Sequence, residues 1–294
     1  MISSRAGSSI DDLRAASTVL SRAWIDGAPF VASHPGDLEW WYTLAAPDEL
    51  ATHLRLWDVD GAPAGWSWVR DDQVNWEIWR GEGADDRPML EAMLRSAIDE
   101  TTGALHAWAP EDDLATLGTL HGLGFRPGAR RLSQFQRPTG ATPISIASLP
   151  SGYGIRALDG PDDVPARVEA HRAAFAPSSM TIEKYTRLTG LPHYRFDDDL
   201  VVEAPDVSIA AFAMAWWDPV ARVGEYEPVG THPDHQRRGL GRALLSHGLN
   251  RYRDLGARLV QVYSNADNAS SEGLYQAVGF ERLRYRRLFD RPKG

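Results

Sequence analysis

The stretch "THPDHQRRGLGRALL", residues 231–245, joins a turn rich in arginine and glycine to an apolar pattern of helical spacing. Gly239 and Gly241 carry no Cβ, so the backbone there can approach a bound group closely. Leu240 and Ala243 begin a series of apolar residues on one helical face, which predicts a helix that starts at the glycines. The free N–H groups of such a helix start, with arginines around them, favour a phosphate group. The stretch therefore predicts a binding site for a phosphate-bearing ligand.

Composition narrows the class of protein. The chain has 294 residues, of which 43% are hydrophobic and 24% are charged, and these values are typical of a soluble globular protein. It contains no cysteine, which excludes disulfides, thiolate metal sites and cysteine nucleophiles. No run of about 18 apolar residues occurs, and residues 1–17 lack the apolar core of a signal sequence. We therefore expect a cytoplasmic protein with no membrane partner.

Charge is distributed unevenly along the chain. Residues 151–294 contain 19 acidic and 19 basic residues, whereas residues 1–150 contain 21 acidic residues and 12 arginines and carry the whole net charge of −9. A net-acidic chain is a poor candidate for binding nucleic acid, but it can attract a cationic small molecule. We therefore expect a small-molecule amine as the partner, in cationic form, and no nucleic acid.

Prolines and small polar residues between positions 137 and 154 predict a boundary within the chain. We expect one domain over residues 1–137, a linker over 138–150, and a second domain over 151–294. The second domain alternates strands and helices, which predicts an α/β fold. Its expected strands are 153–158, 199–204, 207–217, 221–231 and 257–264, its expected helices are 163–175, 182–188, a helix from 240 and 268–278, and a strand pair follows from Phe280 onward.

The order of these elements and two motifs are similar to those of the GNAT acyltransferase superfamily. The motifs are Gln236-Arg237-Arg238-Gly239-Leu240-Gly241 and "NASSEGLYQAVGF", residues 268–280, and the resemblance covers residues 151–294. It implies an α/β fold with a mixed, mostly antiparallel sheet that is flanked by helices. In that family the N–H groups of the turn hold the pyrophosphate of acetyl-coenzyme A, so the resemblance implies acetyl-CoA as co-substrate and no metal. The residues that it implies for binding acetyl-CoA are Val229, Gly230, Thr231, Gln236, Arg237, Arg238, Gly239, Leu240, Gly241, Arg242 and Asn268.

The first half of the chain is faintly similar to the second. "TLHGLGFRPGARRLSQF", residues 119–135, aligns with "LYQAVGFERLRYRRLF", residues 274–289. In this alignment the counterpart of the phosphate turn in the first half begins near residue 81. Asp85 and Asp86 lie there and would repel a phosphate. We therefore expect two tandem GNAT-like domains, as in mycothiol synthase-like tandem acetyltransferases. The first is expected to be a degenerate copy that closes one side of the acceptor cleft.

Glu225 and Glu227 are the candidates for a catalytic base. They are two residues apart on a predicted strand, so they project from the same face. A carboxylate that apolar groups desolvate has a raised pKa and can accept a proton from an amine. The alternative is that both are solvent-facing carboxylates of the strand. The sequence leaves open which of the two acts as the base.

Pro228 follows the two candidate bases directly and precedes the strand edge that the resemblance assigns to acetyl-CoA. It has no N–H to donate, which predicts a bulge or a parting of strands. By resemblance the pantetheine arm pairs with the open edge at Val229, Gly230 and Thr231, which also supplies an N–H to the thioester carbonyl. The alternative is an ordinary edge-strand proline.

Tyr275 is the candidate for a catalytic acid. By resemblance its hydroxyl lies near the thioester sulfur, and a phenol with an ordinary pKa near 10 can donate a proton to a thiolate at neutral pH. The alternative is a tyrosine of the core. Asn268 is a predicted N-cap of the helix that follows it, and by resemblance it also contacts the pantetheine or its phosphate. His232 and His235 have no third ligand nearby in the sequence, so we expect no metal site.

Two functions remain open at this point. The first is an N-acetyltransferase that moves an acetyl group from acetyl-CoA to the amine of a small molecule or amino-sugar, by direct attack in a ternary complex. The second is a non-catalytic acyl-CoA-binding module with a regulatory or interaction role. The presence of Tyr275 and of Glu225 or Glu227 favours the enzyme, because a module that only binds needs no acid or base.

Overall fold

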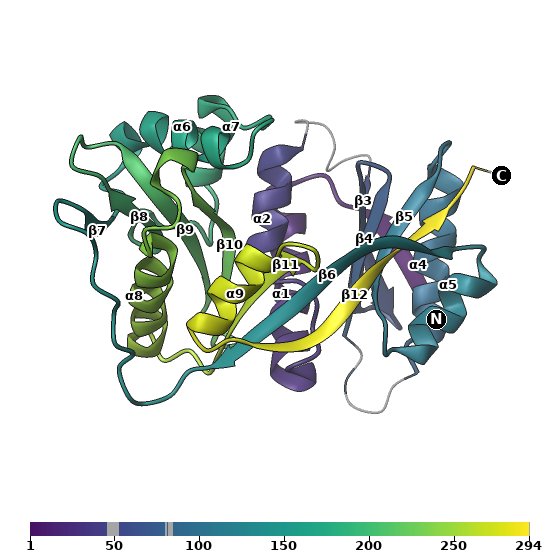
Figure 1. The fold of residues 1–294 in the computed structure, drawn as a ribbon. Helices are drawn as coiled ribbons and strands as arrows, with labels where there is room; N and C mark the ends of the chain where they lie inside the picture. The colour runs from purple at the N-terminus through teal and green to yellow at the C-terminus, as the bar shows by residue number, and fades with distance from the viewer. Residues whose placement is uncertain (46–52, 80, 82–84, 294) are drawn as a thin grey trace.

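One mixed sheet runs through the molecule (Figure 1). The computed structural model describes residues 1–45, 53–79, 81 and 85–293. Across these residues the strand order in the sheet is β1-β2-β3-β4-β5-β12-β6-β11-β10-β9-β8-β7. The strands are β1 (Ile2–Ala6), β2 (Leu54–Val59), β3 (Ala62–Arg70), β4 (Gln73–Ile78), β5 (Leu105–Pro110), β6 (Arg126–Pro138), β7 (Gly154–Ala157), β8 (Asp199–Glu203), β9 (Ile209–Asp218), β10 (Val223–Thr231), β11 (Leu259–Asn265) and β12 (Glu281–Arg291).

Helices cover both faces of this sheet. They are α1 (Ile10–Gly27), α2 (Pro35–Leu44), α4 (Arg87–Glu100), α5 (Leu114–Gly122), α6 (Val164–Ala174), α7 (Ile182–Thr189), α8 (Leu240–Asp254) and α9 (Ala269–Ala277). In β9, Ala211 and Ala213 pack in one cluster with α8, whereas Phe212 and Trp216 pack in clusters with α6 and α7. Side chains of a strand point alternately to its two faces, so β9 is buried on both. Among the described residues, no helix combines the length and the apolar character that a membrane span requires.

The elements predicted for residues 153–278 are confirmed. β8, β9 and β10 form an antiparallel meander, and α8 connects β10 to the parallel strand β11. The predicted strand pair from Phe280 onward is wrong, because residues 281–291 form the single strand β12. This segment contains no glycine, proline or asparagine that would favour a turn, and it pairs with β6 on one edge and with β5 on the other.

The two halves of the chain exchange their last strands. β6 comes from the first half but pairs with β11 of the second, and β12 comes from the second half but pairs with β5 of the first. Figure 1 shows β6 in teal and β12 in yellow running side by side between the halves. Residues 139–153, which connect β6 to β7, form no helix or strand. The predicted division at 138–150 stays a prediction, since the sheet is continuous across both halves.

β10 and β11 pair over only part of their length. The parallel pairing runs from Val223 to Tyr226 and then stops, and the pairing of β10 with β9 shifts register between Tyr226 and Val229. Pro228 lies in this gap and has no N–H to donate to a ladder. The parting of strands predicted from Pro228 is confirmed, and the edge-strand alternative is wrong because β10 lies between two strands.

The first half packs closely on the second through α2. A Cβ on Gly36 would lie 2.3 Å from the ring of Trp216 in β9, so α2 meets this strand at the closest distance that a glycine allows. Nε2 of His34, which caps α2, lies 3.1 Å from the carbonyl oxygen of Val223 in β10. Trp24 of α1 also belongs to one buried cluster with Val223. The apolar core is therefore shared between the two halves.

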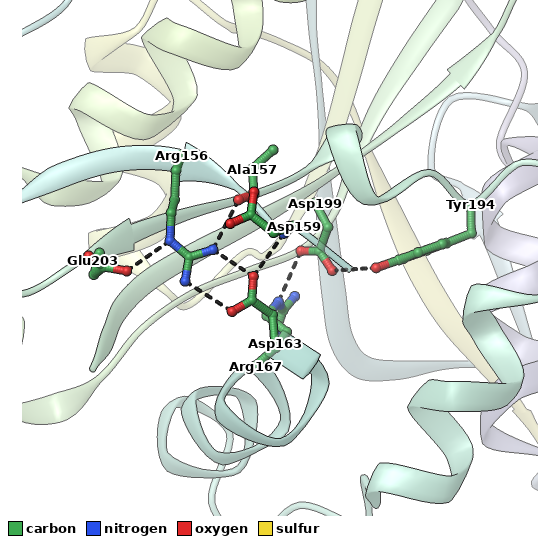
Figure 2. A network of polar contacts seen from close by, with 8 residues as sticks. All are labelled: Arg156, Ala157, Asp159, Asp163, Arg167, Tyr194, Asp199 and Glu203. Atoms are coloured by element: carbon green, nitrogen blue, oxygen red, sulfur yellow. Dashed lines mark hydrogen bonds and ion pairs between the residues drawn. The ribbon is translucent and has the colours of Figure 1, made fainter. Parts of the chain in front are cut away.

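A buried ion pair holds α6 against β8 (Figure 2). Nε of Arg167 donates to Oδ1 of Asp199 at 3.0 Å, and neither side chain is exposed. The hydroxyl of Tyr194 donates to the other carboxylate oxygen at 3.2 Å. At the protein surface nearby, Arg156 of β7 binds Asp163 at the start of α6. Removal of one partner of a buried ion pair is costly, so these contacts fix α6 on the sheet.

The contact between Gly36 and Trp216 predicts opposite results for two Gly→Ala substitutions. Alanine favours a helix over glycine by about 1 kcal/mol, but at Gly36 its methyl group would overlap the indole, so we expect Gly36→Ala to lower the free energy of unfolding by about 1–3 kcal/mol. Gly118 of α5 is exposed and its Cβ would meet nothing within 4 Å, so Gly118→Ala should raise this free energy by up to about 1 kcal/mol. Urea unfolding measures both. Equal stabilisation by the two substitutions would contradict the packing of α2 on β9.

Candidate active site

A cavity of about 390 Å³ lies between the two halves, beside the point where β10 leaves β11. Both halves line it. The first half supplies Ala32, Ser33, Asp37, Trp41, Gln73, Asn75, Trp108 and Leu132. The second half supplies Phe175, Glu225, Glu227, Pro228, Val229, Tyr263, Ser264, Asn265, Asn268, Ser271, Tyr275 and Arg286. The cavity thus brings together the predicted base candidates, the predicted acid and two of the predicted acetyl-CoA-binding residues.

The two candidate bases differ in their surroundings. Glu225 is 1% exposed, and its Oε2 accepts a hydrogen bond from Nε2 of Gln261 at 3.2 Å. Burial, and next the nearby Asp37, raises the pKa of Glu225 well above its ordinary value. Glu227 is half-buried, and burial followed by Asp37 raises its pKa to about 8. The alternative of two solvent-facing carboxylates is wrong, because Glu225 is buried and both line the cavity.

Asp37 is a third carboxyl group of the cavity, which was not predicted from the sequence. It lies at the third position of α2, where its Oδ2 accepts the N–H of His34 at 2.8 Å. Burial raises the pKa of Asp37 to about 6, although the His34 N–H, Glu225 and Arg286 act in the opposite direction. Helix capping explains an aspartate at this position completely, so the sequence carries no sign of its place in the cavity.

Tyr275 lies in α9 with its ring against Phe135 and Phe280, and it is 5% exposed. Burial, with a smaller contribution from Glu227, raises the pKa of Tyr275 above its ordinary value, so its hydroxyl keeps the proton at neutral pH. Oδ1 of Asn268 accepts the N–H of Ser271 at 3.1 Å, which confirms the predicted N-cap of α9. The acid candidate therefore holds a proton that it can donate into the cavity.

The predicted phosphate turn lies outside the cavity, at the far end of β10. α8 starts at Leu240 with no side chain that caps it, after Gly239 adopts a left-handed backbone conformation with φ of 77°. Within the described residues, the N–H groups of Leu240, Gly241 and Arg242 have no hydrogen-bond acceptor. Arg237, Arg238 and Arg242 are exposed around this helix start. The first turn of α8 therefore offers free donors and positive charge to an anion.

The remaining acetyl-CoA-binding candidates connect this turn to the cavity. Val229 lines the cavity, and Gly230 and Thr231 continue β10 toward the turn. A Cβ on Gly230 would lie 2.3 Å from the ring of Phe212, and a Cβ on Gly241 would lie 3.1 Å from Leu274. Nε2 of Gln236 donates to the carbonyl oxygen of Thr231. The candidates thus form a continuous path along the surface from the start of α8 to the three carboxyl groups.

The corresponding region of the first half lies between α4 and α5. These helices follow β4 and precede β6, as α8 and α9 follow β10 and precede β12. A hollow of about 600 Å³ lies there, but the charges on its wall are paired, Arg87 with Asp85 and Arg95 with Glu91. The predicted counterpart of the phosphate turn near residue 81 falls mainly on residues 80 and 82–84, which lie outside the described residues.

Further residues of the cavity have no local signal in the sequence. Nε1 of Trp108 donates to Oε1 of Gln73 at 2.9 Å, whose amide in turn donates to Oδ1 of Asn75 at 2.8 Å. Nη2 of Arg286 donates to the carbonyl oxygen of Trp108 at 2.9 Å. Trp41 also lines the cavity. Among the described residues, no group of three or more His, Cys, Asp or Glu side chains could hold a metal ion.

Comparison with known proteins supports the fold and the family. The acetyltransferase (GNAT) family model matches residues 169–280. A mycothiol acetyltransferase from Pseudarthrobacter chlorophenolicus is 27% identical over 212 residues, which cover 69% of this chain and 64% of that protein, less than two thirds of its length. A mycothiol acetyltransferase from Beutenbergia cavernae is 30% identical over 254 residues, which cover 81% of this chain and 82% of that protein.

A solved structure shows the same fold. A tandem GNAT protein from the clavulanic acid biosynthesis pathway superposes with a TM-score of 0.70 at 12% identity, over 100% of this chain and 98% of that one. The α/β fold predicted from the sequence, with a mixed and mostly antiparallel sheet flanked by helices, is confirmed. The degenerate character of the first half stays a prediction.

Proposed function

Because this chain belongs to the GNAT family of acetyltransferases, we propose that it transfers an acetyl group from acetyl-CoA to the amine of a small molecule in the cavity between its halves. One observation carries the proposal. Buried carboxyl groups and a protonated tyrosine share a cavity that opens where β10 parts from β11. A module that only bound acyl-CoA would have no need of these groups. The related mycothiol acetyltransferases support acetyl as the group transferred.

Acetyl-CoA fits the path from α8 to the cavity. Its pyrophosphate is held by the free N–H groups of Leu240, Gly241 and Arg242, with Arg237 and Arg238 beside them. Its pantetheine arm pairs with the open edge of β10 at Val229–Thr231, in the manner of an added strand. An N–H of this edge donates to the thioester carbonyl and stabilises the negative charge that develops on its oxygen. The acetyl group then lies in the cavity.

The reaction is a direct attack of the amine on the thioester. The nitrogen lone pair forms a bond to the carbonyl carbon, and the C–S bond breaks. A carboxylate, Glu225 or Glu227, takes the proton that the nitrogen loses, and the Tyr275 hydroxyl gives a proton to the departing thiolate. A base is most effective when its pKa lies near the working pH, and the pKa of about 8 at Glu227 meets this condition.

The acceptor is a small amine, cationic in solution, such as an amino-sugar. Three carboxyl groups face the cavity from α2 and β10, and Asp37, whose pKa is about 6, supplies negative charge at neutral pH that attracts an ammonium ion. Trp41 and Trp108 offer aromatic faces that can pack on a sugar ring or on a cation. The excess of acidic residues in the first half supports the same class of acceptor.

Replacement of the carboxylates tests the proposed base. We expect at least one of Glu225→Gln and Glu227→Gln to lower kcat by about 10²-fold or more, with acetyl-CoA affinity nearly unchanged, because the amide cannot accept the proton. The assay is release of free coenzyme A with a panel of amines. Glu281→Gln, at an exposed glutamate of β12, serves as the control and should keep full activity. Full activity of both single variants and of the double variant would place the base elsewhere. A wild-type protein that binds acetyl-CoA but releases coenzyme A with none of the amines would favour the non-catalytic module.

Tyr275→Phe tests the proposed acid. It keeps the ring and its packing but removes the donor, so we expect acetyl-CoA affinity to survive while kcat falls by about 10²-fold. Because the pKa of Tyr275 is raised, the wild-type activity that depends on this proton should persist to pH 10, and a decline at higher pH should vanish in the variant. Tyr226→Phe is the control: its hydroxyl donates to the Leu245 carbonyl oxygen at 3.1 Å, so it should lose about 1 kcal/mol of stability and keep its kcat. An unchanged kcat across the whole pH range in Tyr275→Phe would leave this tyrosine with a packing role alone.

A further inference from the structure

Asp37 of the first half reaches the carboxyl groups of the second. It is 6% exposed, and its Oδ2 is fixed by the N–H of His34 at 2.8 Å. α2, which carries it, is seated on β9 through the contact of Gly36 with Trp216. Asp37 is therefore held in place both by its own helix and by the interface between the halves, and its carboxyl group faces the cavity.

The carboxyl groups of Asp37 and Glu225 are in hydrogen-bond contact. Two ionised carboxylates are both acceptors, so a hydrogen bond between them requires one proton. Two like charges at this separation in a buried site repel each other strongly, which also favours retention of one proton. Glu225 is 1% exposed, so water does not relieve this repulsion. The shared cavity, the burial of both groups and their contact therefore favour one shared proton.

The groups around Asp37 and Glu225 do not remove the need for a shared proton. Gln261 of β11 donates one hydrogen bond to Glu225, at 3.2 Å. Arg286 of β12 lowers the pKa of Asp37, but its Nη2 donates to the carbonyl oxygen of Trp108 at 2.9 Å. The other titratable groups that face the pair or these neighbours are Glu227, Tyr252, Tyr263, Tyr275 and Glu77. Burial raises the pKa of each tyrosine, so these phenols stay neutral, and burial raises the pKa of Glu77 to about 7.

We propose that Asp37 and Glu225 form one carboxyl pair that holds a single proton, and that Asp37 is a positioning residue that sets the protonation of Glu225 from the opposite half of the chain. This proposal rests on the proposed function for its role in catalysis, but not for the existence of the pair. It also separates the roles of the two glutamates: Glu225 belongs to the pair, whereas Glu227, whose pKa Asp37 also raises, lies outside it.

The pair is a second proton acceptor, beside Glu227, for a substrate that arrives as an ammonium ion. Such an acceptor must lose one proton before its nitrogen can attack, and another after the C–N bond has formed. The first passes to the charged carboxylate of the pair, and the second passes to the carboxylate of Glu227. The C–S bond breaks, and the thiolate takes a proton from Tyr275. One of the two stored protons then returns to Tyr275 and the other leaves to solvent, so the amide, free coenzyme A and one released proton balance the reaction.

Asp37→Asn tests the pair without the need for any substrate. The amide oxygen can still accept the His34 N–H, so α2 keeps its cap, while the like charge beside Glu225 disappears. We expect the pKa of Glu225 to fall by about one unit or more, which carbon-13 NMR of protein labelled at glutamate carboxyl carbons measures directly. In turnover assays the acid limb of kcat/KM should shift to lower pH by a similar amount.

The matched control is Asp12→Asn. Asp12 occupies the same position of α1 that Asp37 occupies of α2, accepts the N–H of Ser9, and is 7% exposed, but it pairs with Arg5 away from the cavity. Its replacement removes a comparable capping carboxylate, so it reports what the loss of a cap alone does. We expect Asp12→Asn to leave the titration of Glu225 and the pH profile unchanged.

A reciprocal variant covers the case in which Asp37→Asn does not fold. Glu225→Leu should raise the pKa of Asp37, observed with labelled aspartate, because it removes the protonated carboxyl group whose hydrogen bond lowers that pKa. A Glu225 titration that stays in place in folded Asp37→Asn, or an Asp37 titration that stays in place in Glu225→Leu, overturns the pair. If both pKa values shift as expected but the protein acetylates no amine, the pair is supported and the proposed function is overturned.

Discussion

Pro228 has no backbone N–H, and the arrangement of the site depends on that missing donor. β10 pairs with β11 up to Tyr226 and then departs from it, so the end of a central strand is left with one free edge. The cavity lies in the space where the strands part, and it takes Glu225 and Glu227 from one side of the parting and Tyr275 from the other. The same free edge continues to the start of α8, where N–H groups point outward without a cap. Pro228 thus lies between a set of buried carboxyl groups on one side and an open strand edge that leads to an uncapped helix start on the other.

The second constraint is the exchange of strands between the halves. With β12 between β5 and β6, and β6 beside β11, neither half completes its own sheet. The shared core around Trp24 and the close fit of α2 on β9 extend this dependence to the helices. Asp37, Trp41 and Trp108 consequently line the same cavity as the carboxyl groups of β10. The first half therefore contributes to the cavity through the groups that it places there.

The sequence predicts well what is local. Strands and helices of residues 153–278 follow from apolar periodicity and turn signals, and the parting of β10 follows from a single proline. The single strand at residues 281–291 could not be predicted in this way. Whether a segment without turn residues folds back or continues depends on strands that lie far away in the chain. Asp37 was missed for a related reason: a capping box accounts for it locally, and only the packing of α2 on the second half brings it to Glu225. The spacing of Glu225 and Glu227 predicts a common face, but their burial depends on that same packing.

A crystal structure of the protein with coenzyme A bound tests the proposed site most directly. We expect one coenzyme A for each chain, with its pyrophosphate oxygens within hydrogen-bond distance of the N–H groups of Leu240–Arg242. Its thiol should lie inside the cavity, beside the Tyr275 hydroxyl and on the side of the β10 edge that Pro228 leaves open. A coenzyme A whose pyrophosphate sits at the start of α4, or whose thiol lies outside the cavity that Asp37, Glu225 and Glu227 share, would contradict the account.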